Sequence, residues 1–567
     1  MKNLHYSALS SIADLGTGNY IQVSKIDVLG NRARLLKTPS EILMPISMTF
    51  GDVVIRLACN MGQISECTII SSSSHGALVE AKGTLGDYSI ELTFRHEEKF
   101  SMECRTRFTP TMGIRQLQLL PELLLLEGGS YSAMKPGRVY LQQDQLRSGA
   151  CLFDLGDAWG TAFLFQDLGE LSTFAEDTRT SLAGSVRVRW PEVGLYIRSN
   201  PEGNLKRGRK YIVNHFYLIL EKGPVQCEKE ASRRFVSYLA RIYPKIKKPA
   251  VRQENFVSIA QGCIETLSKN HGCWQRVGKF SYLNAYLNDY ATPPESMVQM
   301  AILPSLHRYA RRLNSRRARA IASSLSAGIS EFFNEKTGTI ERWMPSKSQQ
   351  LTPTEEQKKP RIMDSWYLHH PLLQISYLLE EGNLEDGIRE LFFKSVEFCT
   401  LVASKFDYEW PVFYDMDTLH ATKEETAPGK GGQKDVGGLY AMLMMRAYKL
   451  TGDERYLSEA TKAADALMKY GLDLLYQSNN TATAAEALVE LWSVHQEVRY
   501  LEQAQLCFGN LIRNTSIWDR QYGNSKNIPT FFSLFPLSDA PYSAVFEEQE
   551  CVSTVHRTLR AVHFGEK

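Results

Sequence analysis

Hydrophobic and polar residues alternate along the chain up to about Leu220. In YSIELTF, Ile90, Leu92 and Phe94 fall on one face, and FSMECRTRF repeats the pattern a few residues later. A period of two is that of a β-strand with one buried face. SVRVRW, GLYIRS and NHFYLIL follow the same pattern, with Gly, Asn and Pro residues between them. Consecutive strands without intervening helices predict an antiparallel β-sandwich domain in residues 1–225.

The hydrophobic period changes to that of an α-helix in the second half of the chain. A helix near Glu228–Ile242 and the Pro- and Lys-containing stretch YPKIKKPAVRQ indicate a linker with a helix at residues 226–251. Beyond it, DVGGLYAMLMMRAYKL places apolar side chains on one helical stripe. Gly452 suits the C-terminus of that helix, and Asp453 suits the N-cap of the next. Residues 252–567 are therefore predicted to form a helical domain.

Short and long links alternate between the predicted helices. The predicted helical ranges are 252–270, 293–314, 316–334, 364–381, 384–405, 435–450, 455–471, 481–494, 497–514 and 543–562. The links NS, EGN, TGDE and HQE are short, and most of the others are long. Alternate links of consecutive antiparallel helices lie at opposite ends, so the long links should meet at one end. Long loops gathered on one face are a common place for a functional site.

A β-rich half, a linker helix and helical hairpins with turns of the TGDERYL type occur in that order along the chain. This organisation resembles the six-hairpin glycosidase superfamily, and no specific family is indicated. The resemblance implies a two-domain β + α fold, with an N-terminal antiparallel β-sandwich followed by an (α/α)6-type helical toroid. It also implies a sugar-like substrate bound at the loop end of the toroid. Polysaccharide lyases and glucuronyl C5-epimerases share related architectures.

Composition narrows the range of partners. Lys and Arg number 65 against 63 Asp and Glu, which gives a net charge of +2. This balance argues against a nucleic-acid binder. The start MKNLHYSALSSIADLGTG lacks the apolar core of a signal peptide, and the apolar run LQLLPELLLLEGG is too short to span a bilayer. We expect a cytoplasmic protein that binds neither nucleic acid nor membrane, and no oligomeric state is inferred.

Aromatic residues concentrate in or beside the long links of the helical half. Aromatic faces suit the apolar C–H faces of sugar rings. The predicted substrate-binding residues are Trp343, Trp366, Tyr367, His369, Trp410, Tyr414 and Arg361. Trp274 and Trp518 also fall in long links. The alternative is that these rings fasten the loops onto the rim of the helices.

Carboxylates are frequent in the same links, as in DYEWPVFYDMDT. Glycoside hydrolysis needs one carboxylic acid to protonate the leaving oxygen and a second carboxylate to activate water or to attack the anomeric carbon. The leading catalytic pair is Asp364 with either Glu409 or Asp435, because these residues lie nearest to helix starts. Helix N-capping explains Asp364 and Asp435 equally well.

Other chemistries remain open at the same place. A uronic-acid lyase or epimerase needs a base, a proton donor and a cation for the substrate carboxylate. The candidate bases and donors are Tyr367, Tyr414, His369 and His370, and the candidate cations are Arg276, Arg342 and Arg361. A phosphorylase would hold phosphate at the helix that follows PGKGGQKDVGG. A non-catalytic toroid would bind glycan or protein through the same rim. No metal-ligand spacing or nucleotide loop occurs, so no metal or cofactor is predicted.

Overall fold

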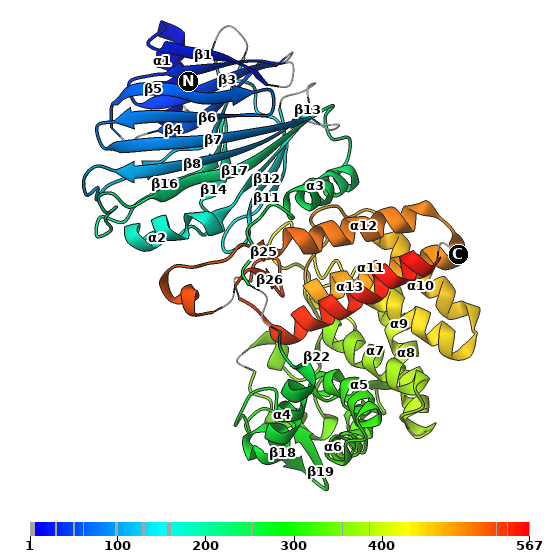
Figure 1. The fold of residues 1–567 in the computed structure, drawn as a ribbon. Helices are drawn as coiled ribbons and strands as arrows, with labels where there is room; N and C mark the ends of the chain where they lie inside the picture. Colours follow the sequence, from blue (N-terminus) through cyan, green and yellow to red (C-terminus); the bar gives the residue numbers. More distant parts are fainter. Residues whose placement is uncertain are drawn as a thin grey trace. The chain divides into compact units, whose positions relative to one another are not determined.

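The chain divides into a β-rich unit and a helical unit in the computed structural model. The described residues are 6–28, 31–48, 51–59, 62–96, 100–127, 131–155, 160–250, 253–353, 355–384, 386–528, 530–540 and 542–565. Unit 1 comprises Met1–Ala250, Ile512–Phe535 and Asp539–Ser543, and unit 2 comprises Val251–Leu511, Pro536–Ser538 and Ala544–Lys567. Figure 1 shows strands in the N-terminal part of the chain and helices in most of the remainder.

Unit 1 contains two large antiparallel sheets. The 7-stranded sheet has the order β1-β2-β3-β4-β10-β15-β14. Its strands are β1 (Ile21–Val28), β2 (Asn31–Lys37), β3 (Glu41–Met48), β4 (Gly51–Cys59), β10 (Leu123–Leu126), β14 (Val186–Arg189) and β15 (Glu192–Leu195). The 8-stranded sheet has the order β11-β12-β13-β17-β8-β7-β6-β5. Its strands are β5 (Ile64–Ser73), β6 (Gly76–Gly83), β7 (Gly86–His96), β8 (Phe100–Pro110), β11 (Val139–Gln142), β12 (Gly149–Asp154), β13 (Gly160–Gln166) and β17 (Tyr211–Lys222).

The period-two pattern of the sequence accounts for the core of unit 1. Ile90 and Phe94 on β7 are fully buried, as the alternation predicts. Along β8, buried and half-buried residues alternate over the whole strand. These side chains share one hydrophobic core with residues of the other sheet, such as Val53 and Ile55 on β4. The helices of this unit are α1 (Tyr6–Thr17), α2 (Ser172–Thr178) and α3 (Glu228–Ile242). The last of these is the helix predicted in the linker.

Unit 2 contains helices at all the predicted positions. They are α4 (Phe256–Lys269), α5 (Ser296–Arg312), α6 (Arg316–Ser326), α7 (Ser365–Glu380), α8 (Asp386–Lys405), α9 (Val436–Thr451), α10 (Glu454–Leu467), α11 (Ser478–His495), α12 (Val498–Arg513) and α13 (Val545–Gly565). Asp453 accepts a hydrogen bond from the Arg455 backbone N–H at 3.0 Å and so caps α10. Gly452 ends α9 with a φ of 72°, in the left-handed region that favours glycine. Both caps confirm the sequence prediction.

The odd-numbered helices form an inner set. Helices α5, α7, α9, α11 and α13 pack against one another in succession, and α6, α8 and α10 each pack on the helix before them. Their apolar side chains make one continuous core. Glu550 on α13 accepts hydrogen bonds from His370 and Gln374 on α7 at 2.7 and 2.9 Å. Because α13 also packs on α11, this contact connects the last inner helix back to α7.

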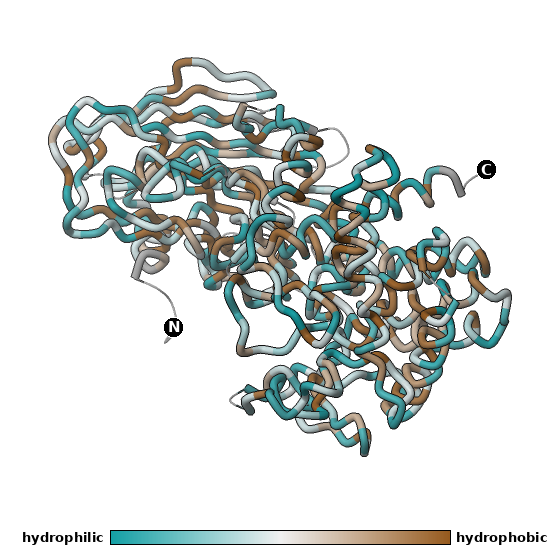
Figure 2. The backbone as a smooth tube through the Cα atoms, turned by 90° about the horizontal axis from the view of Figure 1, so that it is seen from below, coloured by the Kyte–Doolittle hydropathy of each residue, from teal (hydrophilic) through white to brown (hydrophobic). Residues whose placement is uncertain are grey.

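Short strands and tight loops fill the links of unit 2. They are β18 (Trp274–Val277), β19 (Phe280–Leu283), β20 (Phe333–Asn334), β21 (Thr339–Ile340), β22 (Ile362–Asp364), β23 (Phe413–Asp415) and β24 (Ala421–Lys423). Hydrophilic and hydrophobic positions interchange at short intervals along the chain (Figure 2). In the described ranges, none of the helices combines the length and the apolar character needed to cross a bilayer.

Most of the segment between α12 and α13 belongs to unit 1, with Pro536–Ser538 in unit 2, whereas the predicted boundary placed all of it in the helical domain. It forms β25 (Thr515–Ile517) and β26 (Phe532–Leu534). Trp518, which the sequence assigned to the loop rim, is 1% exposed and lies in the core of unit 1. Its indole N–H donates to the carbonyl of Leu146 at 3.2 Å, and the Ile517 N–H donates to Ser148 Oγ at 2.7 Å. Hydrophobic period cannot reveal contacts between residues so far apart in the chain.

Replacing Trp518 with alanine should destabilise unit 1 strongly. Loss of a fully buried tryptophan costs about 3–5 kcal/mol because contacts are lost and a cavity is left. Ile528→Ala is the matched control, because Ile528 lies in the same segment and is 62% exposed. That control should change stability by less than about 0.5 kcal/mol. Chemical denaturation of both variants checks this, and equal effects would contradict the placement of Trp518 in the core.

Candidate functional site

The N-terminal ends of the inner helices meet at one end of unit 2. Their hydrogen bonds include Ser296 N–H to the Arg342 carbonyl (2.8 Å), Trp366 N–H to Gln433 Oε1 (3.2 Å) and Gln477 N–H to Asp435 Oδ2 (2.8 Å). These bonds join the starts of α5, α7, α9 and α11 to one another or to the links that precede them. The long links therefore come together, as their alternation with short links predicts.

Asp364 lies at the start of α7 and is 9% exposed. Its Oδ1 accepts hydrogen bonds from the Trp366 backbone N–H at 2.9 Å and from Gln433 Nε2 at 2.8 Å. The N-capping role that the sequence allowed is thus present. Burial raises the pKa of Asp364, and the hydrogen bond from Gln433 and the charge of Arg342 oppose that rise. A carboxyl group in this state holds its proton to a higher pH than an exposed aspartate does.

Asp435 precedes α9, but its carboxyl group bonds to the start of α11. Oδ2 accepts from the backbone N–H groups of Tyr476 and Gln477 at 2.9 and 2.8 Å, and from Thr481 Oγ1 at 2.7 Å. Asp435 is fully buried, and burial raises its pKa to about 7 despite these hydrogen bonds. Its Oδ1 is buried and has no partner among the described groups. Asp435 thus fastens α9 to α11 through a carboxyl group that ionises with difficulty.

Glu409 does not join this pair. Its side chain is 53% exposed and forms an ion pair with Lys469, which follows α10. The next residue, Trp410, accepts a hydrogen bond from the Gln433 N–H through its carbonyl, so the backbone does pass close to the site. The Glu409 carboxylate itself is bound to the lysine. Two of the three predicted catalytic acids are connected. Gln433 bonds to Asp364 and lies in the same segment as Asp435.

Arg342 and Glu295 form a buried ion pair beside Asp364. Arg342 Nε donates to Glu295 Oε2 at 3.1 Å, and both side chains are less than 10% exposed. The guanidinium lies 3.6 Å from the Tyr367 ring centroid and 4.5 Å from that of Trp343. Its charge acts on the carboxyl group of Asp364. Burial raises the pKa of the Tyr367 hydroxyl above its ordinary range, with Arg342 opposing.

The aromatic residues that were predicted to bind substrate are more buried than side chains that stack on a sugar ring need to be. Trp343 and Trp366 are 6% and 7% exposed, whereas Trp410 and Tyr414 are 3% and 0% exposed. Trp366, Trp410 and Tyr414 belong to the hydrophobic core of unit 2. Trp410 contacts His369 and Tyr440 edge-on or tilted. Trp410 and Tyr414 therefore support the loops from within, and Trp343 and Tyr367 lie beside the Arg342 side chain.

His369 and His370 occupy different environments, as neighbouring helical residues must. His369 is fully buried, with Nδ1 2.6 Å from the Ser365 carbonyl, and burial lowers its pKa to about 4. His370 contacts Glu550 through Nε2 at 2.7 Å. Arg361 lies at the edge of the cluster and is already bound to Asp417 at 3.0 Å and to Glu341 at 2.5 Å.

Several polar residues of the site were missed by sequence reasoning. They are Glu295, Gln433, Asn479, Asn480 and Glu550. Single buried polar residues carry no recognisable local pattern, although Glu295 falls in the first turn of the predicted helix 293–314. Buried polar atoms that have no partner within the described part of the chain include Arg342 Nη1, Trp366 Nε1, His370 Nδ1, Asp435 Oδ1 and both side-chain polar atoms of Asn480. Such groups are costly in a dry interior and suit a site completed by water or by a polar ligand.

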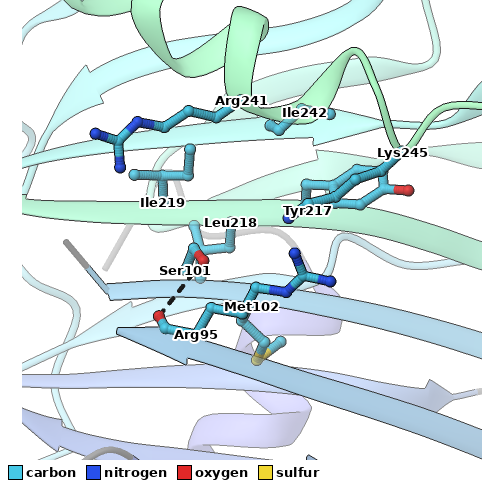
Figure 3. Close-up of a pocket in the computed structure, with 9 residues that line it drawn as sticks. All are labelled: Arg95, Ser101, Met102, Tyr217, Leu218, Ile219, Arg241, Ile242 and Lys245. Atoms are coloured by element: carbon cyan, nitrogen blue, oxygen red, sulfur yellow. Dashed lines mark hydrogen bonds between the residues drawn. The ribbon is translucent and has the colours of Figure 1, made fainter. Parts of the chain in front are cut away.

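Unit 1 contains a separate cavity of about 230 Å³ between α3 and the strands β7, β8 and β17 (Figure 3). Arg95, Arg241 and Lys245 contribute cationic side chains to its wall. Lys245 lies over the Tyr217 ring at 5.8 Å. The pKa of Glu103 on β8 is lowered, first by His215 and then by Lys245 and Arg95. Two of these three cations, Lys245 and Arg95, therefore already stabilise a neighbouring carboxylate. Within the described residues, no cluster of three or more His, Cys, Asp or Glu side chains could hold a metal ion.

The Asp435→Asn variant should change how stability depends on pH. An unfolded aspartate has a pKa of about 3.9, whereas Asp435 in the folded unit has a pKa of about 7. The stability contributed by this proton is therefore full below about pH 4 and is lost as the pH rises to about 7. Each pKa unit corresponds to about 1.4 kcal/mol, so the loss is on the order of 4 kcal/mol. The unfolding free energy of the wild type minus that of the variant should therefore decrease as the pH rises from about 4 to about 7.

Asp453→Asn provides a control of opposite sign. Arg455 lowers the pKa of the exposed Asp453, so its contribution is lost as the pH falls rather than as it rises. Denaturant titrations of the three proteins at several pH values measure both trends. A constant difference between wild type and Asp435→Asn from pH 4 to 8 would contradict the burial of an ionisable Asp435.

No protein-family description matches the chain, and no curated protein matches it either. Among solved structures it is similar to cellobiose 2-epimerase from Bacillus thermoamylovorans, with 14% identity, a TM-score of 0.40, and coverage of 57% of this chain and 84% of that one. A family 76 glycoside hydrolase from a bovine Bacteroides thetaiotaomicron strain has 11% identity and a TM-score of 0.35, and the match covers 81% and 96% of the two chains. A polysaccharide lyase has 8% identity and a TM-score of 0.36, over 88% and 82%. Similarity this distant identifies neither a reaction nor a catalytic residue.

Proposed function

We propose that the protein is a carbohydrate-active enzyme, and specifically a glycoside hydrolase. In this proposal unit 1 is a β-sandwich, unit 2 is an (α/α) toroid, and the active site lies at the N-terminal ends of the inner helices. The observation that carries it is the group formed by Asp364, Arg342 and Glu295. Two carboxyl groups in different electrostatic environments lie there beside one guanidinium. Different environments allow one carboxyl group to be an acid while the other remains a carboxylate.

Asp364 is the proposed proton donor. Its pKa is raised by burial, so it retains a proton at a pH where an exposed aspartate is ionised. The hydrogen bonds from Trp366 N–H and Gln433 Nε2 both fall on Oδ1. We assign to Oδ2, the other oxygen, the proton that passes to the departing glycosidic oxygen. Capping of α7 holds the group in place on a rigid element, which suits a proton donor.

Glu295 is the proposed second carboxylate. Arg342 stabilises its negative charge through a hydrogen bond of 3.1 Å. Such a group can accept a proton from water or attack the anomeric carbon directly. Asp435 takes a positioning role in this arrangement, because its Oδ2 is saturated by three donors from the α11 end. Glu409 has no role, because it is held in a surface ion pair.

The aromatic residues have two proposed roles. Trp343 and Tyr367 contact the Arg342 guanidinium and would border the bound sugar. Trp366 is 7% exposed, and its buried indole N–H has no partner in the described part of the chain. A sugar hydroxyl could accept a hydrogen bond from it. Trp410, Tyr414 and His369 support these residues from the core.

The alternative of a uronic-acid lyase or C5-epimerase has weaker support. Such enzymes need a cation for the substrate carboxylate. Arg342 is paired with Glu295, and Arg361 is paired with two carboxylates. His369, one of the candidate bases, is enclosed in the core. A phosphorylase would require inorganic phosphate for turnover, and a non-catalytic toroid would bind a glycan without cleaving it.

Three substitutions test the hydrolase assignment. Asp364→Asn and Glu295→Gln keep the acceptor oxygens that bind Gln433 and Arg342 but remove the acid and the carboxylate. Each should lower kcat by about 10²–10⁴-fold with little effect on the fold, which is the usual contribution of an acid–base group. Glu409→Gln is the control and should retain wild-type turnover.

Turnover is measured as release of reducing ends from a panel of oligosaccharides, with and without phosphate. Full activity in Asp364→Asn or Glu295→Gln would refute their assignment. Strict dependence on phosphate would replace hydrolysis with phosphorolysis, and an unsaturated uronide product would replace it with elimination.

A further inference from the structure

An exposed aromatic loop lies next to the proposed active site. Residues 284–292, here named the aromatic loop, lie between β19 and α5. Tyr286, Leu287 and Tyr290 are 74%, 61% and 58% exposed. Large apolar side chains that remain this exposed in one loop, while Trp343 and Trp366 are buried, are typical of a binding surface.

The backbone of the aromatic loop is fixed although its rings are exposed. The Asn288 N–H and the Asn284 side-chain amide both donate to the carbonyl of Gly272, at 2.9 and 3.1 Å. Asp289 Oδ1 accepts from the N–H groups of Ala291 and Thr292 at 3.2 and 3.1 Å. A Cβ at Gly272 would come within 2.2 Å of Asn288 Oδ1, so a larger residue there would displace the Asn288 side chain. A loop held in this way presents its rings with little loss of conformational entropy on binding.

The aromatic loop is continuous with the catalytic group. It leads directly into Glu295 and the start of α5. The Tyr286 hydroxyl is close enough to Tyr367 to contribute to the raised pKa of that residue. Tyr367 in turn lies against the Arg342 guanidinium at 3.6 Å. The aromatic loop therefore joins, through Glu295, the segment that forms the buried ion pair with Arg342.

The charge at this surface is balanced before any ligand binds. Arg342 is 5% exposed, and Glu295 neutralises its charge at 3.1 Å. Its Nη1 is nevertheless buried with no acceptor in the described residues. A ligand carboxylate here would add an uncompensated negative charge beside Asp364 and Glu295, which is costly in a buried setting. A hydroxyl or ring oxygen would satisfy the same donor without adding charge.

We propose that the site takes a neutral sugar chain, with Arg342 Nη1 donating to an oxygen of the sugar beside Asp364 and with Tyr286 and Tyr290 packing on the adjoining sugar. The inference rests on the proposed function for the location of the catalytic group. It adds the class of substrate and a binding surface that extends beyond the catalytic carboxyl groups. The apolar faces of neutral pyranose rings match the exposed tyrosine rings.

Binding to the full-length Asp364→Asn protein tests this inference separately from catalysis. Isothermal titration with mannotetraose, cellotetraose, maltotetraose and tetragalacturonate should give binding for at least one neutral sugar and none for the acidic one. Tyr286→Ala and Tyr290→Ala should each weaken that binding by about tenfold, the scale of one aromatic contact. Tyr243→Ala is the matched control, since Tyr243 is 41% exposed in unit 1, and it should bind normally.

Arg342→Lys keeps the positive charge but loses the planar group that stacks on Tyr367 and donates from Nη1. It should weaken neutral-sugar binding more than tenfold, with the fold checked by circular dichroism. Binding of tetragalacturonate in preference to the neutral sugars overturns the inference, as does absence of binding to every sugar tested. Binding that survives both tyrosine substitutions also overturns it.

The two proposals fail in different ways. Tyrosine-dependent binding of a neutral sugar without turnover in the wild-type protein leaves this inference intact and removes the hydrolase assignment. If the wild-type protein cleaves a neutral sugar and substitutions of Tyr286, Tyr290 and Arg342 leave that turnover unchanged, the hydrolase assignment stands and this inference is removed.

Discussion

The loop end of unit 2 is positioned by hydrogen bonds between neighbouring hairpins. Each of these bonds joins the start of one inner helix to the link that precedes a different inner helix. Asp435 precedes α9, yet its carboxyl group bonds to two backbone N–H groups at the start of α11. Gln433 precedes α9 as well and bonds to both Asp364 and the Trp366 N–H at the start of α7. The first N–H groups of a helix have no partner within that helix. Here they are satisfied by side chains of neighbouring hairpins, so the loop end is ordered by long-range contacts.

This arrangement places polar groups where a helical core would ordinarily be apolar. Asp364, Arg342 and Glu295 lie beside large aromatic rings, and several donors and acceptors around them have no partner among the residues that the structure describes. Each polar group loses its hydration on burial, and this loss is unfavourable when no hydrogen bond within the protein replaces it. A polar ligand that enters this end can complete the hydrogen bonds that the chain leaves unmade. The same groups that reduce the stability of the apoprotein therefore favour binding of an oxygen-rich molecule such as a sugar.

The sequence predicted the secondary structure well because periodicity and capping are local. The helices of unit 2 and the caps at Gly452 and Asp453 follow from patterns within a few residues. Long-range partners were not predictable in the same way. Trp518 enters the core of unit 1, and Glu295 pairs with Arg342 across an intervening hairpin. Tryptophan is also a poor guide to a sugar platform here, because its large apolar area favours burial. The exposed rings of the aromatic loop are those of Tyr286 and Tyr290.

The central claim is that ligand binds at the N-terminal ends of the inner helices and at the aromatic loop. Hydrogen–deuterium exchange with and without a neutral oligosaccharide that the protein binds measures this most directly. We expect slower exchange in peptides covering residues 284–296 and 339–367, and unchanged exchange throughout unit 1. Protection confined to unit 1, or to α8 and α10 on the outside of unit 2, would contradict the account.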